Sequence, residues 1–224
     1  MMKMQQLATT FVAIAVAGTT LLRADADRLQ DAATVVSEMS NADNGIPSNL
    51  WAKAKCVAVV PGVKKAALGI GGQYGRGYIS CRNDSAAGWS APGAVRIEGG
   101  SIGFQIGGSD TDVIMLVLND RGVDRLLSSK FTVGADAAVA AGPVGRQANA
   151  QTDATMMAEI LAWSRSRGAY AGISLQGSTL REDDSENKEL YGSELKNKDI
   201  VKGSTKVPAA AAALIDTLSK FKTN

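Results

Sequence analysis

The chain carries five glycines in nine residues in the stretch Gly69-Ile70-Gly71-Gly72-Gln73-Tyr74-Gly75-Arg76-Gly77, inside a predicted strand over Ala67–Arg82. Glycine weakens a strand unless it serves a bend, a bulge or a close approach of two backbones. We therefore expect a strongly curved sheet that curls toward an open barrel. A dinucleotide-binding loop is disfavoured, because G-x-G-x-x-G counted from Gly69 requires glycine where Tyr74 stands, and no helix is expected to follow.

The flanking sequence predicts more strands than helices. Strands are expected at Cys56–Val60 (closed by Pro61-Gly62), Ile97–Gly108, Asp112–Leu118 and Tyr170–Leu175. The spacing in Met156–Ser164 fits either a helix or a strand, and the hairpin turn expected at Ser166-Arg167-Gly168 favours a strand. Helices are expected at Asp27–Ser40, around Leu50 and Trp51 with Ser48 as cap, at Asp120–Ser128 with Asn119 as cap, and at Val207–Phe221. Glu182–Lys188 is predicted to be a charged loop. The fold class is α+β, a curved, mainly antiparallel, Gly-rich sheet or open barrel flanked by N- and C-terminal helices.

The N-terminus has the pattern of a secretory signal peptide. Lys3 precedes an uncharged run over Leu7–Leu22, and Ala24 and Ala26 form the small-residue exit that a signal peptidase accepts. The run is too short for a comfortable membrane span, which needs about 20 apolar residues. We therefore expect cleavage after Ala26 and a single mature domain over 27–224. The expected location is outside the cytoplasm, in the periplasm or associated with the envelope, with secretion as a further possibility.

Composition restricts the chemistry. The chain has no histidine, which excludes Ser-His-Asp and Cys-His catalysis. Ser90, Ser101 and Ser164 lack the context of a nucleophile elbow. A net charge of +2 argues against nucleic-acid binding. Two cysteines without histidine cannot make a zinc site alone, and the acidic stretch Glu182–Glu186 lacks the EF-hand pattern, so no metal or cofactor is expected, with weak calcium binding as the minor alternative. No enzymatic activity is expected, although the absence of histidine leaves a Ser-Lys pair open.

The cysteines Cys56 and Cys81 both lie in predicted strands. In an exported chain an even cysteine count favours a disulfide, and two buried free thiols are the alternative.

Basic residues gather around the first strands. The cluster consists of Lys53, Lys55, Lys64, Lys65, Arg76 and Arg82. If the strands are adjacent, these residues form a positive face for anionic phospholipid headgroups; ordinary solvated lysines at strand ends are the equal alternative. The apolar stripe of the first helix could lie on a membrane, but its acidic character favours packing on the sheet.

Several ordered motifs resemble one known family. They include Pro61-Gly62-Val63-Lys64-Lys65-Ala66, Trp89-Ser90-Ala91-Pro92, Gly103-Phe104-Gln105-Ile106-Gly107-Gly108-Ser109-Asp110-Thr111-Asp112-Val113 and Lys130-Phe131-Thr132-Val133-Gly134-Ala135-Asp136-Ala137. In this order they resemble the SYLF domain, a lipid-binding domain, over roughly Leu29–Tyr191.

The resemblance implies peripheral binding of anionic phospholipid through a basic face and the N-terminal amphipathic helix. The predicted lipid-binding residues are Arg28, Lys53, Lys55, Lys64, Lys65 and Arg76. The alternative is a structural or interaction module that docks another envelope protein without catalysis. Some members of the family bind actin, but for an exported protein actin is expected to be an improbable partner.

Overall fold

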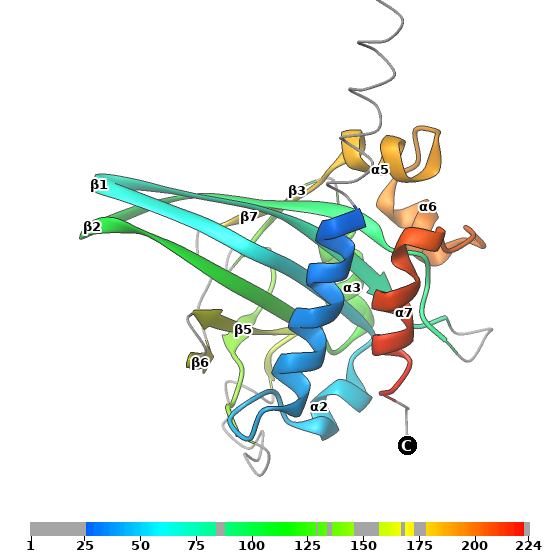
Figure 1. Ribbon diagram of the computed structural model, residues 1–224, viewed down its shortest axis with the longest axis horizontal. Coiled ribbons are helices and arrows are strands. Elements are labelled where there is room, and N and C mark those ends of the chain that lie inside the picture. The colour runs from blue at the N-terminus through cyan, green and yellow to red at the C-terminus, as the bar shows by residue number, and fades with distance from the viewer. Residues whose placement is uncertain are drawn as a thin grey trace, which may run out of the picture.

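The computed structural model describes residues 26–83, 88–128, 130–133, 136–145, 157–166, 169–172 and 178–221. The expected signal peptide therefore lies outside the described residues, apart from residue 26. Two long strands, β1 (Cys56–Cys81) and β2 (Gly93–Val117), pair antiparallel over nearly their whole length (Figure 1). They merge what the sequence predicted as four strands.

The Pro61-Gly62 pair bends β1 without ending it, contrary to prediction. The register with β2 shifts between Val60 and Val63, and Gly62 adopts φ +56°. The Gly62 N–H donates to Asp112 Oδ1 at 2.9 Å, so a side chain replaces the missing ladder partner. The segment is thus a β-bulge, which bends a strand and increases its twist.

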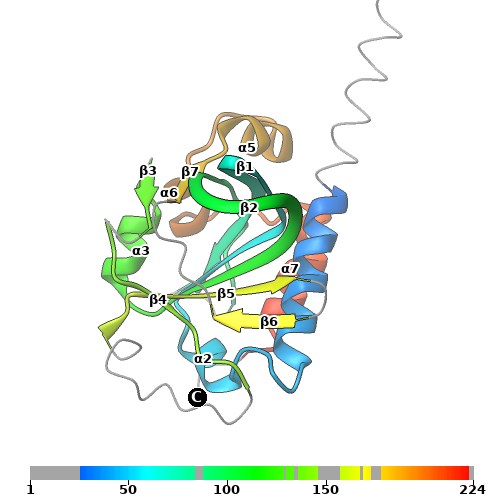
Figure 2. The same ribbon diagram turned by 90° about the vertical axis from the view of Figure 1, so that its left-hand side faces the viewer.

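The glycine-rich strand curls back on itself, as the sequence predicted. Extended, 26 residues would span about 85 Å, yet the Cα atoms of Cys56 and Cys81 are only 3.9 Å apart. Figure 2 shows β2 following the same curl. Where the two arms of β1 meet, a Cβ on Gly77 would lie 2.0 Å from the Val59 carbonyl oxygen. The backbones approach so closely that only glycine fits.

This close approach gives a first prediction. Gly77→Ala is expected to lower the free energy of unfolding by about 1–3 kcal/mol or more, because a backbone atom must move to admit the methyl group. Gly72→Ala is the matched control in the same strand, since its nearest new neighbour would be Gly99 O at 4.0 Å. Urea unfolding of both variants measures the difference, and equal stability of the two would contradict the close-approach explanation.

Shorter strands extend the sheet beside β2. β5 (Ile160–Ser166) pairs with residues 112–117 of β2, and β7 (Thr179–Glu182) pairs with residues 95–98. β3 (Lys130–Thr132) and β6 (Ala169–Gly172) add antiparallel to β7 and β5, whereas β4 (Val139–Ala141) is parallel to β5. The sheet is mainly antiparallel, as predicted. The Ser166–Ala169 pairing also agrees with the predicted hairpin, although residues 167 and 168 lie outside the described part.

Helices cover both faces of the curled sheet. The N-terminal helix (residues 26–41) and α7 (Ala212–Leu218) lie side by side over one face, with α2 (Ser48–Lys53) near their end (Figures 1 and 2). α3 (Asp120–Leu126) and α6 (Asn197–Lys202) pack against the other face, and α5 (Asp184–Tyr191) lies near α6. This arrangement confirms the α+β class with helices at both ends.

The alternation of β1 divides the core into two layers. Val57 and Val59 pack with the N-terminal helix, whereas Ala58 and Val60 pack on the opposite face with α3 and α6. Both sets are buried because successive strand residues point to opposite faces. The apolar stripe of the N-terminal helix, including Leu29 and Val36, is fully buried, so the expected packing on the sheet is confirmed.

Two local helix predictions need correction. Ser48 does not cap α2; Pro47 precedes the helix, and no side chain caps it. The C-terminal helix does not begin at Val207, because Pro208 is extended and disfavours helical geometry in the residue before it. A 3₁₀ turn (Ala209–Ala211) leads into α7 instead. Asn119 caps α3 as predicted, its side chain accepting the Gly122 N–H at 2.8 Å.

The predicted charged loop at Glu182–Lys188 is the end of β7 followed by α5. Asp183 is the N-cap and accepts the Glu186 N–H, while Gly192 closes the helix in the left-handed conformation. Asp183, Glu186 and Asn187 are buried. Two carboxylates of this segment, Asp183 and Glu186, therefore face the protein, whereas Asp184 and Lys188 are exposed.

Candidate functional site

The six predicted lipid-binding residues do not form one positive face. Arg28 and Arg76 converge on buried carboxylates, Lys53 and Lys55 border a cavity at the closed end of β1, and Lys64 and Lys65 lie on the far part of β1. Because β1 runs out to the projecting end of the sheet and returns (Figure 1), residues near in sequence lie in three places. Their role in lipid binding stays a prediction.

Glu186 is the centre of the first group. Its Oε1 accepts from Arg28 Nη1 at 2.5 Å and from the Tyr78 hydroxyl, and Arg76 Nε lies 3.2 Å from its Oε2. Glu186 is fully buried, while the two arginine side chains retain about a quarter of their exposure (23% and 27%). Burial, together with the Glu186 carboxylate, raises the pKa of Tyr78, so the phenol stays protonated and donates.

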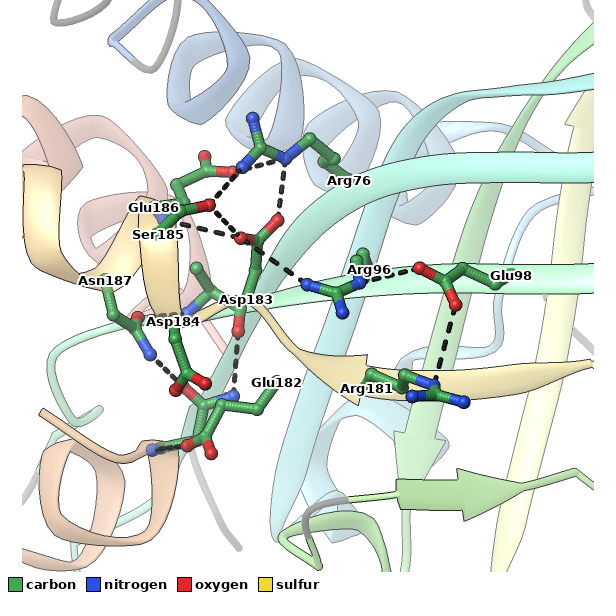
Figure 3. Close-up of polar contacts among 12 residues, drawn as sticks. Arg76, Arg96, Glu98, Arg181, Glu182, Asp183, Asp184, Ser185, Glu186 and Asn187 are labelled. Atoms are coloured by element: carbon green, nitrogen blue, oxygen red, sulfur yellow. Dashed lines mark hydrogen bonds and ion pairs between the residues drawn. The ribbon is translucent and has the colours of Figure 1, made fainter.

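Asp183 continues this cluster toward β2 (Figure 3). Arg76 Nε donates to Asp183 Oδ2 at 2.7 Å, and Arg96 Nη1 lies 3.9 Å from Asp183 Oδ1. Burial opposes ionisation of Asp183, but hydrogen bonds from Arg76 and Ser185 outweigh it and lower its pKa. Arg96 Nε also donates to Glu98 Oε1 at 2.7 Å. The other carboxylate oxygen of Glu98, Oε2, lies 3.5 Å from Arg181 Nε. We call Arg28, Arg76, Tyr78, Asp183 and Glu186 the arginine–carboxylate cluster.

Amides fix α5 to the sheet beside this cluster. The Ala94 N–H donates to Asn187 Oδ1 at 2.8 Å, and Asn187 in turn donates to Asn197 Oδ1 at 2.8 Å. Asn197 returns a hydrogen bond to the Ala94 carbonyl at 2.8 Å. These bonds join β2, α5 and α6 into one polar seam. Arg28 and Arg76 thus help to hold helices on the sheet. They could bind a lipid headgroup only if their ion pairs with Asp183 and Glu186 opened.

The second group lies at the base of β1. The disulfide between Cys56 and Cys81 is present, which confirms the predicted pairing. Lys55 Nζ bonds Asp120 Oδ1 at 2.6 Å, and Lys53 is exposed at the last turn of α2. Arg82, the remaining member of the basic cluster, stacks on the Trp89 ring with its guanidinium carbon 4.5 Å from the centroid.

The third group belongs to a part of the sheet that we call the distal ribbon, residues 63–74 of β1 and 99–111 of β2. The β2 part of the ribbon lies between the segment that pairs with β7 and the segment that pairs with β5. Among the described residues, the two strands of the ribbon pair only with each other. Figure 1 shows the ribbon extending beyond the helices. Lys64 is exposed and lies opposite Asp110, Lys65 is partly buried, and residues 66–75 carry no charge.

Among the three serine candidates, the structure gives side-chain contacts for Ser90. Ser90 Oγ accepts the Cys81 N–H at 3.0 Å and donates to the Ala91 carbonyl at 3.0 Å, so it serves the backbone. Ser164 is buried in β5, and the side chain of Ser101 lies outside the described residues. Among the described residues, no group of three potential metal ligands was found, and no helix is long and apolar enough to span a bilayer.

Comparison with known proteins decides the family. A family profile described as "Ysc84: Las17-binding protein actin regulator" matches residues 98–221. The human "SH3 domain-containing YSC84-like protein 1" is 33% identical over 189 residues, which cover 84% of this chain and 55% of the relative. The chain belongs to the Ysc84 family. This membership confirms the SYLF resemblance.

Fungal relatives agree with this assignment. "Protein YSC84" of Saccharomyces cerevisiae is 34% identical over 186 residues, covering 81% of this chain and 39% of the relative. The Schizosaccharomyces pombe "SH3 domain-containing protein PJ696.02" is 35% identical over 178 residues, or 78% of this chain and 41% of the relative. This Ysc84-family chain thus spans about half the length of its mammalian relatives and about two-fifths of its fungal ones.

The family corrects one expectation about partners. Actin was expected to be an improbable partner because of the predicted export signal. The matching profile is described as an actin regulator, and a second yeast relative is named "LAS seventeen-binding protein 3". These names describe binding and SH3 domain-containing proteins. These descriptions contradict the expectation that actin is an improbable partner.

Sequence reasoning missed the arginine–carboxylate cluster, although a local signal was present. Asp183 and Glu186 stand three residues apart, the spacing of an N-cap and its N3 acid in a capping box. This spacing predicts a helix start at Asp184. Nothing local could have indicated Arg28 or Arg76 as partners, because these residues lie more than 100 positions away.

Proposed function

We propose that this chain is a non-catalytic interaction module that docks a protein partner through the distal ribbon. The observation that carries the proposal is the pairing pattern of β1 and β2. A two-stranded ribbon is marginally stable alone, so a fold gains little by extending one beyond its helices. In the described part of the chain, β1 pairs only with β2, which leaves its other edge open along the distal ribbon.

An open strand edge offers backbone N–H and C=O groups to an added strand. Peptide recognition by strand addition uses these groups for affinity and alternate side chains for specificity. Tyr74, half exposed at 49%, supplies a large aromatic surface at the base of the ribbon. The names of the relatives indicate the class of partner to test first, namely proteins of actin assembly, including Las17 and actin itself.

Anionic phospholipid remains the second candidate, and one observation favours it. Lys64 and Lys65 directly precede the ten uncharged residues 66–75 at the projecting end. Each cation near an anionic membrane contributes about 1 kcal/mol, so the pair would supply about 2 kcal/mol. The N-terminal helix could add to this only by leaving the sheet, because its apolar stripe is buried. Export to the envelope is a separate proposal, tested by whether the mature protein begins at Asp27.

The experiment compares one protein with three probes. The purified chain is sedimented with filamentous actin, captured on immobilised Las17, and floated with phosphatidylcholine vesicles with or without phosphatidylserine. Binding to actin or Las17 without dependence on phosphatidylserine supports the protein-docking proposal. Binding only to anionic vesicles supports the second candidate instead.

A surface variant tests the site. Lys64→Glu, Lys65→Glu and Tyr74→Ala together are expected to weaken binding at least tenfold. Lys206→Glu with Lys220→Glu is the matched charge control, since both lysines are exposed and lie outside the ribbon. Equal binding by the ribbon variant and the control, or no binding of the native chain to any probe, would overturn the proposal.

A further inference from the structure

A cavity opens at the closed end of β1, away from the distal ribbon. It lies between α2, the start and end of β1, α3 and the end of α6, and its volume is about 870 Å³. Small-molecule sites in proteins occupy roughly 300–1,000 Å³. We call it the basal cavity. All the residues that line it belong to the described part of the chain.

Positive charge dominates the rim of the basal cavity. Four cations, Lys53, Lys55, Arg82 and Lys202, face only two carboxylates, Asp120 and Asp124. Lys55 bonds Asp120 at 2.6 Å, and Lys202 Nζ bonds Asp124 Oδ1 at 2.6 Å. The four side chains of these two ion pairs are each at least 43% exposed. Exposed ion pairs contribute little to stability, so both lysines can turn to a stronger anionic partner.

Arg82 supplies a fixed charge that no carboxylate among the described residues neutralises. Its Nε donates to the Ala54 carbonyl at 2.9 Å, and its Nη2 donates to the carbonyls of Trp51 at 3.2 Å and Phe221 at 2.7 Å. These acceptors and the Trp89 ring orient the guanidinium without cancelling its charge. Burial lowers the pKa of Arg82, which is the response of a cation that lacks an anionic partner.

The wall of the cavity is apolar beneath this rim. The buried disulfide sulfurs of Cys56 and Cys81 lie beside Val123 and Val201, which belong to α3 and α6. An apolar wall with a few convergent polar groups is the usual composition of an organic-ligand site. A small inorganic anion would use the rim and leave this wall uncovered.

We propose that the basal cavity binds an amphipathic organic anion, with an acidic head at Lys53, Lys202 and Arg82 and an apolar body against the disulfide and valines. A fatty carboxylate and a lipid phosphate share this chemistry. The site is independent of the distal ribbon, so it can exist whether or not the proposed docking function holds.

Calorimetric titration of the native chain tests the site. Dodecanoate and dodecyl phosphate, below their micellar concentrations, are expected to bind with one-to-one stoichiometry and to raise Tm. Dodecanol tests the need for the charge, and inorganic phosphate tests the need for the apolar body. A preference for dodecanoate over dodecyl phosphate, or the reverse, identifies the head group. Two results would overturn the amphipathic-anion assignment. One is that dodecanol or inorganic phosphate binds as tightly as the amphiphilic anions, and the other is that neither dodecanoate nor dodecyl phosphate binds.

Variants locate the binding. Lys53→Ala with Lys202→Ala is expected to weaken binding of the better amphiphile at least tenfold without a large change in Tm, because both side chains are exposed. Lys188→Ala with Lys220→Ala removes two exposed lysines outside the cavity and is expected to change affinity less than twofold. If the double variant unfolds, Lys53→Glu alone repeats the test. Equal weakening by cavity and control variants would place the ligand elsewhere and contradict the proposal.

Discussion

Glu186→Gln is expected to lower the free energy of unfolding by about 3 kcal/mol, and Tm by about 6–12 °C. The reason is that Glu186 is fully buried and accepts from Arg28 and Tyr78 while facing Arg76. Breaking a buried ion pair by removing one partner typically costs about 3–5 kcal/mol, because the remaining charge is left uncompensated. We expect the lower end of this range, since water still reaches about a quarter of each arginine side chain.

Glu194→Gln is the matched control for this substitution. Glu194 pairs with Lys188 at 2.9 Å, but its side chain is 80% exposed. Water screens an exposed pair, so it adds little to stability, and the control should remain close to the native protein in urea unfolding. Similar losses for Glu186→Gln and Glu194→Gln would show that the arginine–carboxylate cluster does not hold α5 on the sheet.

Removing the disulfide is expected to have an effect of similar size. Cys56 and Cys81 are 25 positions apart, and closing a loop of that length destabilises the unfolded chain entropically by about 3.5 kcal/mol at 25 °C. The bond also joins the two ends of β1, where the Arg82 N–H donates to the Lys55 carbonyl at 2.8 Å. Cys56→Ala with Cys81→Ala should therefore unfold at a clearly lower urea concentration than the native chain.

Reductant supplies the control for the cysteine substitution. Unfolding the native chain in dithiothreitol should reproduce most of the loss, whereas the double variant should not respond to the reductant. If the native chain unfolds at the same urea concentration with and without reductant, the bond does not stabilise the curl.

The sequence indicated the curl of the sheet because its cause is local. Gly75 and Gly77 stand where the arms of β1 touch, and any side chain at those positions would meet Val60, Val63 or backbone atoms. The pairing of Cys56 with Cys81 was favoured on other grounds, because an even cysteine count in a chain expected to be exported suggests a disulfide. Asn119 was recognised as a helix cap because its side chain bonds a backbone N–H only three residues away.

The distribution of the basic residues could not be predicted, because it depends on contacts between distant segments. Arg76 seemed to belong with Lys64 and Lys65 by proximity in the chain. The curl returns it to the base, where α5 brings Asp183 and Glu186 against it. The positive face was therefore predicted from closeness in the sequence, which the curl of β1 does not preserve in space. The burial of Asp183 and Glu186 was missed for the same reason, since these carboxylates find their partners on β1, β2 and the N-terminal helix, although their spacing gave a local signal for the helix itself.

Hydrogen–deuterium exchange tests the docking surface most directly. The chain would be measured alone, with filamentous actin, and with phosphatidylserine vesicles, using whichever probe binds. Backbone amides on the open edge of a strand exchange readily, and an added strand or membrane surface protects them. We predict that bound protein exchanges at least tenfold more slowly over residues 63–74 of β1, with residues 26–41 unchanged. Protection of the N-terminal helix or α7 with no change in the distal ribbon would contradict the central claim.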